Sequence, residues 1–388
     1  MLAGLIERGY EIHMLVPRAT SGMLPSDGLY VHTFPDVLAV PTWIPALLRR
    51  LWLLPAFWAV ASSAAERLAR DLRPDLVLGF SHYGARPAYR AARAVDVPSV
   101  LKLFGVMHAM RLEWSMPRYL YHNLEGVLAF RVPLTHFIIL NDGTMGRTVA
   151  RRWGVTADRL TYLPNGVDLE WAQLETDRGA TRRELGASED AVVFISLSRL
   201  VRSKRIDRIV DAVATAATLT EHHLVLWIAG DGPLRAALER RCRARGIAFR
   251  FLGGVPRERV PHVLAAADAL VSTSELTNMS IPTCEAMVMG TPAIGVDVAG
   301  TSDVVRDMET GLLVAEGSGD ALALALARLA DDTELRARLA RNARRFAAQH
   351  FMDWNERVAA EIGVLERLIA ESRGTPAPPA TGLRSNGA

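Results

Sequence analysis

Short apolar runs alternate along the chain with longer segments in which apolar residues recur about every 3.6 positions. The apolar runs predict strands at 10–16, 75–80, 99–103, 136–140, 191–197, 224–229, 269–272, 293–295 and 312–314. The longer segments between them are rich in Ala, Leu and Arg and predict helices, for example at 205–217 and 233–245. Because strands that alternate with helices form parallel sheets covered by helices, the pattern predicts an α/β protein.

This alternation runs twice, and a polar stretch at 170–188 separates the two series. We therefore expect two Rossmann-like, doubly wound domains, at 1–170 and 171–350. An amphipathic helix at 351–371 is expected to pack back toward the first domain. The tail at 372–388 is rich in Gly, Pro and Ser and is expected to be disordered.

The charge balance excludes several classes of protein. The 45 Lys and Arg residues are nearly matched by 42 Asp and Glu residues, so the formal net charge is only +3. No basic stripe with interleaved aromatic residues is present, and we expect no nucleic-acid partner. The two cysteines, Cys242 and Cys284, lack metal-ligand spacing and fit a reducing compartment. Because residues 1–20 also lack the pattern of a secretory signal, we expect a cytoplasmic protein.

The most apolar region, 41–65, admits two interpretations. Leucines share one helical face, arginines lie beside it and tryptophans flank it: Leu47, Leu48, Leu51, Leu54, Arg49, Arg50, Trp43, Trp52 and Trp58. The uncharged run after Arg50 is shorter than the roughly 20 residues of a transmembrane helix. The region is therefore either an interfacial helix on the anionic inner face of the plasma membrane or an ordinary packing helix of the first domain.

Two cations follow a predicted strand of the second domain. The strand at 191–197 leads into Arg199, and Lys204 lies in the loop before the next helix. The carboxyl ends of parallel strands face the crevice in which α/β folds bind ligands. Two cations there would neutralise a diphosphate as it departs, whereas a solvated basic loop is the alternative interpretation.

Two more strand ends carry candidate binding residues. Gly230 lies in the strand-to-helix turn at 229–233, where glycine permits close backbone approach and positive φ, although a plain turn has the same composition. In the segment 274–287, Pro282 fits the first turn of a helix whose free N–H groups would face an anion. Glu285 lies one turn into that helix and either accepts hydrogen bonds from sugar hydroxyls or only compensates the helix dipole.

Together these segments resemble the retaining glycosyltransferases of family 4, whose GT-B fold has two Rossmann-like domains facing a cleft. The matching runs, in the family's order, are LPNGVD, SRLVRSKRIDRIVDA, WIAGDGPLRAALE, FLGGVPRERVPHVLAAADALVSTS and PTCEAMVMGTPAIGVDVAGTSDVVRDMETGLLV. The resemblance covers nearly the whole chain. It implies that Arg199 and Lys204 bind the donor diphosphate and that Glu285 contacts the nucleotide ribose. It also places at the donor Gly230 and the loop Thr277, Asn278, Met279, Ser280 and Ile281.

The sequence departs from the family pattern at two positions. Thr277 stands where the family has the first glutamate of a pair, which usually touches the transferred sugar, and Glu275 is two residues too early. A histidine that the family often has after a strand of the first domain is replaced by Phe104-Gly105. His108 follows shortly and is a candidate catalytic residue or a structural histidine.

The start of the chain matches only part of the family pattern. Family members open with a strand, a Gly-rich loop and a helix that ends in an Arg-Gly-His-like turn, and residues 1–10 match only the end of that helix. We therefore expect an incomplete chain or a late start codon. Mass spectrometry of the native amino terminus tests this expectation, because a native chain that begins at Met1 would contradict it.

The resemblance implies transfer of a sugar from a nucleotide-diphosphate-sugar to an acceptor hydroxyl, with retained configuration and without a metal ion or cofactor. The second domain would hold the donor and the first the acceptor, and the departing phosphate oxygen would take the acceptor proton. The expected acceptor is a glycan or lipid-linked glycan of a bacterial surface polysaccharide or glycolipid pathway. Two alternatives are a non-catalytic glycosyltransferase-like partner and a nucleotide-sugar epimerase, for which no matching carboxylate and histidine set is found.

Overall fold

The computed structural model describes residues 1–19, 28–36, 46–106, 114–141, 146–275, 279–298 and 300–375, and only the backbone of residues 46–51 and Asn141. Of the predicted positions, Trp43, His108, Thr277 and Asn278 lie outside the described residues. The chain divides into two compact units. Unit 1 holds the described residues of 1–141, 145–163 and 355–388, and unit 2 those of 142–144 and 164–354.

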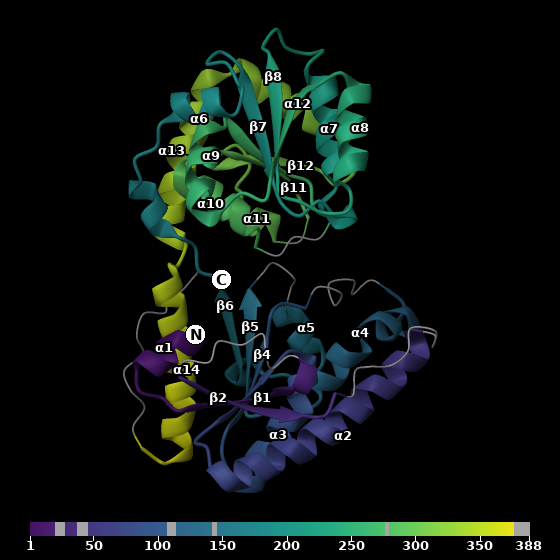
Figure 1. Cartoon of the computed structure of the whole chain (residues 1–388), viewed down its shortest axis with the longest axis vertical. Coiled ribbons are helices and arrows are strands. Elements are labelled where there is room, and N and C mark those ends of the chain that lie inside the picture. Colours follow the sequence, from purple (N-terminus) through teal and green to yellow (C-terminus); the bar gives the residue numbers. More distant parts are fainter. Residues whose placement is uncertain are drawn as a thin grey trace. The chain divides into compact units, whose positions relative to one another are not determined.

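Unit 2 is built on a six-stranded, wholly parallel sheet (Figure 1). The strands are β7 (Val192–Leu197), β8 (Leu224–Ala229), β9 (Ala248–Gly253), β10 (Ala269–Ser272), β11 (Ala293–Val296) and β12 (Gly311–Val314). They lie in the order β12-β11-β10-β7-β8-β9. The chain therefore moves outward from β7 in one direction and, from β10, in the other, which is the strand order of a Rossmann fold.

Helices cover both faces of this sheet. The alternation of β7 explains the two layers, because Val192 and Phe194 enter one apolar cluster whereas Val193 and Ile195 enter the other. The first cluster is completed by α7 (Ile206–Ala216), α8 (Arg235–Arg245) and α12 (Gly319–Asp331). The second is completed mainly by α9 (Val260–Ala266), α10 (Ile281–Met289) and the later part of α13 (Thr333–His350). The short helices α6 (Arg178–Glu184) and α11 (Thr301–Val304) complete the unit.

Unit 1 contains two groups of parallel strands (Figure 1). Strands β1 (Ile12–Pro17) and β2 (Leu29–Phe34) pair with each other. A four-stranded sheet has the order β3-β4-β5-β6, with β3 (Val77–Phe80), β4 (Ser99–Leu103), β5 (His136–Asn141) and β6 (Leu160–Pro164). The helices are α1 (Leu2–Glu7), α2 (Ala46–Leu72), α3 (Ala85–Val95), α4 (Met116–Phe130), α5 (Gly146–Arg152) and α14 (Trp354–Ser372). The predicted α/β class with two Rossmann-like halves is confirmed.

Three strands escaped prediction, and each lies at the end of its sheet. They are β2, β6 and β9. An edge strand is only partly covered by neighbours, so its sequence need not be a continuous apolar run. In β9, for example, Arg250 is exposed among half-buried residues. The fully buried β8 has the opposite pattern, with six buried residues in succession, and its predicted bounds match the structure.

Helix α2 includes most of the apolar region singled out from the sequence. Leu54 and Trp58 are buried in the core of unit 1, as expected for a packing helix. Trp52, in contrast, is 76% exposed, and it follows the arginine pair 49–50 in the sequence. None of the helices in the described ranges combines the length and apolarity that a bilayer span requires.

A buried group of charges joins β4 to α14 inside unit 1. The Lys102 ammonium lies 2.6 Å from Oε1 and 3.0 Å from Oε2 of Glu361, and Arg357 also donates to the Glu361 carboxylate. All three residues are buried. Desolvation lowers the pKa of Lys102, and the negative charge of Glu361 opposes that shift. Removing one member of such a buried group strongly destabilises the folded protein, because it leaves a buried charge without its partner.

A second buried polar residue of unit 1 predicts a pH dependence. His136 on β5 is buried, its Nε2 lies 2.7 Å from Thr161 Oγ1, and burial lowers its pKa to about 4. In the unfolded chain the pKa of this histidine is about 6.5, so the unfolded state binds more protons than the folded state at pH values between the two pKa values. Above about pH 6.5, His136 is neutral in both states and does not lower the free energy of unfolding. As the pH falls toward 4, protonation of this histidine in the unfolded chain lowers that free energy by about 3 kcal/mol.

Replacing His136 with glutamine is expected to remove this pH-dependent part of the free energy of unfolding. Urea unfolding at several pH values between about 4 and 7 measures it. The exposed His223 in unit 2 supplies a matched control, because His223→Gln should leave the slope unchanged. A His136→Gln variant with the slope of the parent protein would contradict the assignment.

Candidate functional site

The two loops that carry most predicted ligand contacts leave adjacent strands of unit 2. Strand β7 ends at Leu197 and β10 ends at Ser272, and the two strands pair in parallel. The order of the sheet reverses between them, and ligands of open α/β sheets bind outside the carboxyl ends at such a point. The segment with Arg199 and Lys204 and the segment with Glu275 to Ile281 thus start at the same edge of the sheet.

A glycine brings the end of β8 against the start of the Arg199 segment. Gly230 has φ +124°, and a Cβ atom on it would lie only 2.0 Å from the carbonyl oxygen of Ser198. Only glycine fits both constraints. The approach is fixed by backbone hydrogen bonds from Ser198 to Ala229 and from Leu200 to Asp231. The predicted Gly230 and Arg199 are therefore neighbours in space.

The two predicted cations lie close enough to act on each other. Lys204 is half-buried, and desolvation lowers its pKa, with a smaller contribution from the positive charge of Arg199. No carboxylate of the described residues forms an ion pair with the Lys204 ammonium. The negative charge of a phosphate bound at this position would oppose the lowering of its pKa. The pair therefore suits a phosphate or diphosphate.

The start of α10 also faces the same edge. Ser280 is the N-cap residue, its side chain does not cap the helix, and Pro282 lies in the first turn. The Ser280 hydroxyl instead accepts a hydrogen bond of 2.8 Å from Thr283 Oγ1, and Met279 packs partly against the core. Helix N–H groups that a side chain leaves open are available to an anion.

Glu285 is the buried carboxylate of this site. It is 4% exposed, and burial raises its pKa, whereas Arg257 opposes the shift from 3.4 Å. Arg257 also forms an ion pair with Asp168 and lies over the ring of Trp171 at 5.1 Å. With Arg257 as its partner, the Glu285 carboxylate can accept hydrogen bonds from the hydroxyl groups of a sugar. Arg257 and Asp168 were missed from the sequence, because they lie in runs that match the family but carry no spacing signal of their own.

Other predicted residues belong to unit 1 or lie outside the described residues. Phe104 is 56% exposed and follows β4 in unit 1, where the family often has a histidine. His108, Thr277 and Asn278 lie outside the described residues, so their predicted roles stay predictions. Among the residues that the structure describes, no group of three or more His, Cys, Asp or Glu side chains is arranged to hold a metal ion.

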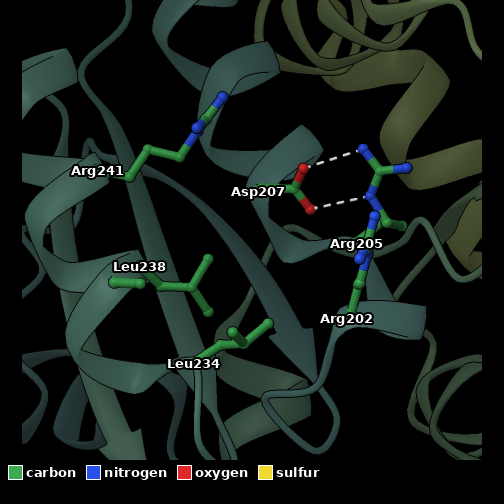
Figure 2. Close-up of a pocket in the computed structure, with 7 residues that line it drawn as sticks. Arg202, Arg205, Asp207, Leu234, Leu238 and Arg241 are labelled. Atoms are coloured by element: carbon green, nitrogen blue, oxygen red, sulfur yellow. Dashed lines mark hydrogen bonds and ion pairs between the residues drawn. The ribbon is translucent and has the colours of Figure 1, made fainter.

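A hollow of about 330 Å³ lies beside the segment that carries Lys204 (Figure 2). It is lined by Arg202, Arg205, Asp207, Leu234, Leu238 and Arg241. Figure 2 shows the Arg205 guanidinium bonded to both oxygens of Asp207. Arg241 is paired with Asp211. Because two of the three arginines are compensated within the protein, we assign no ligand to this hollow.

The parallel sheet of unit 2 makes this an α/β protein, and the cations at its switch point suit a phosphorylated ligand. Two family models match the chain: the one described as Glycosyltransferase Family 4 over residues 1–171, and the one described as Glycosyl transferases group 1 over residues 177–346. Alpha-D-kanosaminyltransferase of Streptomyces kanamyceticus is 30% identical over 315 residues, which span 77% of this chain and 80% of that protein.

Two solved structures share the fold over nearly the whole chain. Alr3699/HepE of Anabaena, in complex with UDP and glucose, has a TM-score of 0.66 at 20% identity and covers 94% of this chain and 95% of its own. WaaG, a glycosyltransferase involved in lipopolysaccharide biosynthesis, has a TM-score of 0.68 at 18% identity and covers 94% and 93%. The chain belongs to the family 4 glycosyltransferases of the GT-B class, which are retaining enzymes that use nucleotide-sugar donors.

Proposed function

We propose that this glycosyltransferase uses a UDP-sugar donor, which it binds at the switch point of unit 2, without a metal ion. The observation that carries the proposal is the pair of cations that follow β7. The positive charge of Arg199 contributes to lowering the pKa of Lys204, and no carboxylate of the described residues pairs with the Lys204 ammonium. The structure of Alr3699/HepE with UDP-glucose supports uridine as the base, because that protein has the same fold.

Each residue of the proposed site has a separate role. The diphosphate lies against Arg199 and Lys204, which stabilise the negative charge that develops on the leaving phosphate. The backbone at Gly230 lets the phosphate approach closely, because glycine has no side chain there. The ribose hydroxyls donate to Glu285, and the start of α10 with Met279, Ser280 and Ile281 lies at the donor sugar. The departing phosphate oxygen takes the proton of the acceptor hydroxyl.

The acceptor proposed here is a glycan or lipid-linked glycan of a surface polysaccharide or glycolipid. It is supported by WaaG, which has the same fold and is involved in lipopolysaccharide biosynthesis. Only one feature of the described residues favours a membrane-bound acceptor, the exposed Trp52 of α2, which two arginines precede in the sequence.

A donor screen tests the proposed function. Nucleotide sugars with different bases are added to the purified chain in EDTA, and the shift in unfolding temperature and the release of nucleotide are measured. The largest shift is expected with a UDP-sugar, and release is expected only when an acceptor is present. Formation of an epimer without transfer, binding without release, or a requirement for added metal would each contradict the proposal.

Membrane contact is tested with vesicles that contain about one-third anionic lipid. A tryptophan at the membrane interface contributes buried apolar area. Trp52→Ser is therefore expected to lower the partition coefficient of the protein onto the vesicles about tenfold. Leu72→Ser removes another exposed apolar residue, at the opposite end of the same helix, and is expected to change it less than twofold. Equal effects of the two variants, or no vesicle binding by the parent protein, would contradict membrane contact through α2. The helix would then serve only to pack against the core of unit 1.

A further inference from the structure

Arg205 has a backbone conformation that is unusual for a residue with a side chain. Its φ is +49° and its ψ is 40°, at the junction between the short helix at Arg202–Lys204 and α7. This left-handed region favours glycine, which adopts it without strain. An arginine at this position therefore needs a compensating role for its side chain.

The Arg205 side chain connects two loops. Its Nε and Nη2 donate to Asp207 Oδ1 and Oδ2 at 3.1 and 3.0 Å, as Figure 2 shows. Its Nη1 donates to Glu275 Oε1 at 2.8 Å, across to the segment that follows β10. The side chains of Arg205 and Glu275 are only 25% and 38% exposed, so the pair is partly shielded from water.

The same two loops are also joined by hydrogen bonds to backbone carbonyls of the Lys204 segment. The backbone N–H of Glu275 donates to the carbonyl oxygen of Ser203 at 2.9 Å. The Thr273 hydroxyl lies 3.1 Å from the carbonyl oxygen of Lys204 and 2.8 Å from that of Arg205. Three successive residues around Lys204 are thus held by the segment that begins at Thr273.

We propose that Arg205 and Glu275 are positioning residues that hold the ammonium of Lys204 where the donor diphosphate binds. The inference rests on the proposed role of Lys204. It also gives Glu275 a role distinct from that of a displaced family glutamate, because the Glu275 carboxylate is engaged by Arg205 and not left to meet the donor sugar. Without the ion pair, the segment after β10 holds the Lys204 loop only through hydrogen bonds to its backbone carbonyls, which do not fix the Arg205 side chain.

An alternative is that the pair contributes only to stability, as many half-exposed ion pairs do to a small extent. The two roles differ in what they change. A positioning role lowers the affinity for the diphosphate and the turnover, and it leaves the binding of the uridine moiety unchanged. A purely structural role lowers the unfolding temperature and leaves the ratio of UDP to uridine affinity unchanged.

The test uses the full chain and a double-mutant cycle. Arg205→Gly keeps a backbone that tolerates positive φ while removing the side chain, and Glu275→Gln removes the charge of the partner. Each is expected to lower kcat/KM for the donor about tenfold and to weaken UDP binding about fivefold relative to uridine. Because the two side chains share one contact, the effects of the single variants are expected not to multiply. The double variant should lose no more activity than Arg205→Gly, which also removes the contact with Asp207. Arg205→Lys keeps the charge and is expected to retain at least one-third of the activity.

Two controls separate this inference from the proposed function. Arg241→Gln breaks another ion pair on the same surface, with Asp211, and is expected to leave kcat/KM within twofold. Lys204→Ala reports on the donor site itself. If Lys204→Ala abolishes turnover while the single variants at 205 and 275 stay within twofold, or their effects multiply, the positioning role is wrong and the donor site stands. If Lys204→Ala retains full turnover, the donor site is wrong.

Discussion

Replacing Lys204 with alanine is expected to lower kcat/KM for the nucleotide-sugar by a factor of about 10² to 10³, as the loss of one group that stabilises developing charge commonly does. The leaving diphosphate gains negative charge in the transition state, and Lys204 lies at the switch-point edge with Arg199 as its charged neighbour. Because no carboxylate of the described residues pairs with this ammonium, its removal leaves none of their buried charges unpaired. The unfolding temperature should therefore stay within a few degrees of that of the parent protein.

The measurement is steady-state kinetics with donor and acceptor varied separately. Arg202→Ala is the matched control, since Arg202 is an exposed cation two residues away, and its kcat/KM should change less than twofold. Near-normal turnover of Lys204→Ala would contradict the proposed diphosphate site. Lys204→Arg adds a second readout. Desolvation lowers the pKa of Lys204, so the alkaline fall in kcat/KM of the parent enzyme begins below the ordinary lysine value of about 10.4, and the arginine variant lacks this contribution.

Glu361→Leu is expected to lower the free energy of unfolding by about 3–5 kcal/mol, which is the usual cost of removing one member of a buried ion pair. The carboxylate contacts both Lys102 and Arg357, and all three residues are buried where β4 meets α14. Its removal leaves two cations without a counter-charge in a region from which water is excluded. We expect the contact between α14 and the sheet of unit 1 to weaken in this variant, because the ion pair of Lys102 with Glu361 joins that helix to β4.

Urea unfolding measures this loss, with the transitions of the two units analysed separately. Glu366→Gln, one turn further along the same helix, removes a half-exposed carboxylate that pairs with Arg8 and Tyr10, and it should cost less than about 1 kcal/mol. Replacing Lys102, Arg357 and Glu361 together with apolar residues of similar size is expected to restore much of the stability. A Glu361→Leu variant as stable as the parent protein would contradict the account of this buried group.

The fold was largely predictable because its central strands are buried on both faces. Such strands need continuous apolar runs, and those of β7, β8 and β10 are visible in the sequence. The strands that were missed, β2, β6 and β9, lie at sheet ends, and β9 carries a mixed pattern, although the end strands β3 and β12 were predicted. The bounds of strands in the core therefore follow from local hydrophobicity, whereas the edges of a sheet depend on which elements lie beside them.

The candidate site was predictable only in part. Arg199, Gly230 and Lys204 follow strand ends, where position in the sequence and position in space coincide. The contacts of Glu275 with Arg205, and of Glu285 with Arg257, join residues that are 70 and 28 positions apart. No periodicity or motif records such a pairing, because it depends on how separate loops meet after the sheet has formed.

Lys102 and Lys204 are the only lysines in the sequence, although the chain has 45 Lys and Arg residues in total. One is sealed in the core of unit 1, and the other is half-buried at the proposed diphosphate site. An amine-reactive reagent that modifies neutral amines should therefore label a single side chain in the folded protein, at Lys204, whose lowered pKa favours the reaction. The native protein thus carries a built-in chemical reporter, in which protection by a nucleotide reads out occupancy of the donor site and labelling of Lys102 reads out opening of unit 1.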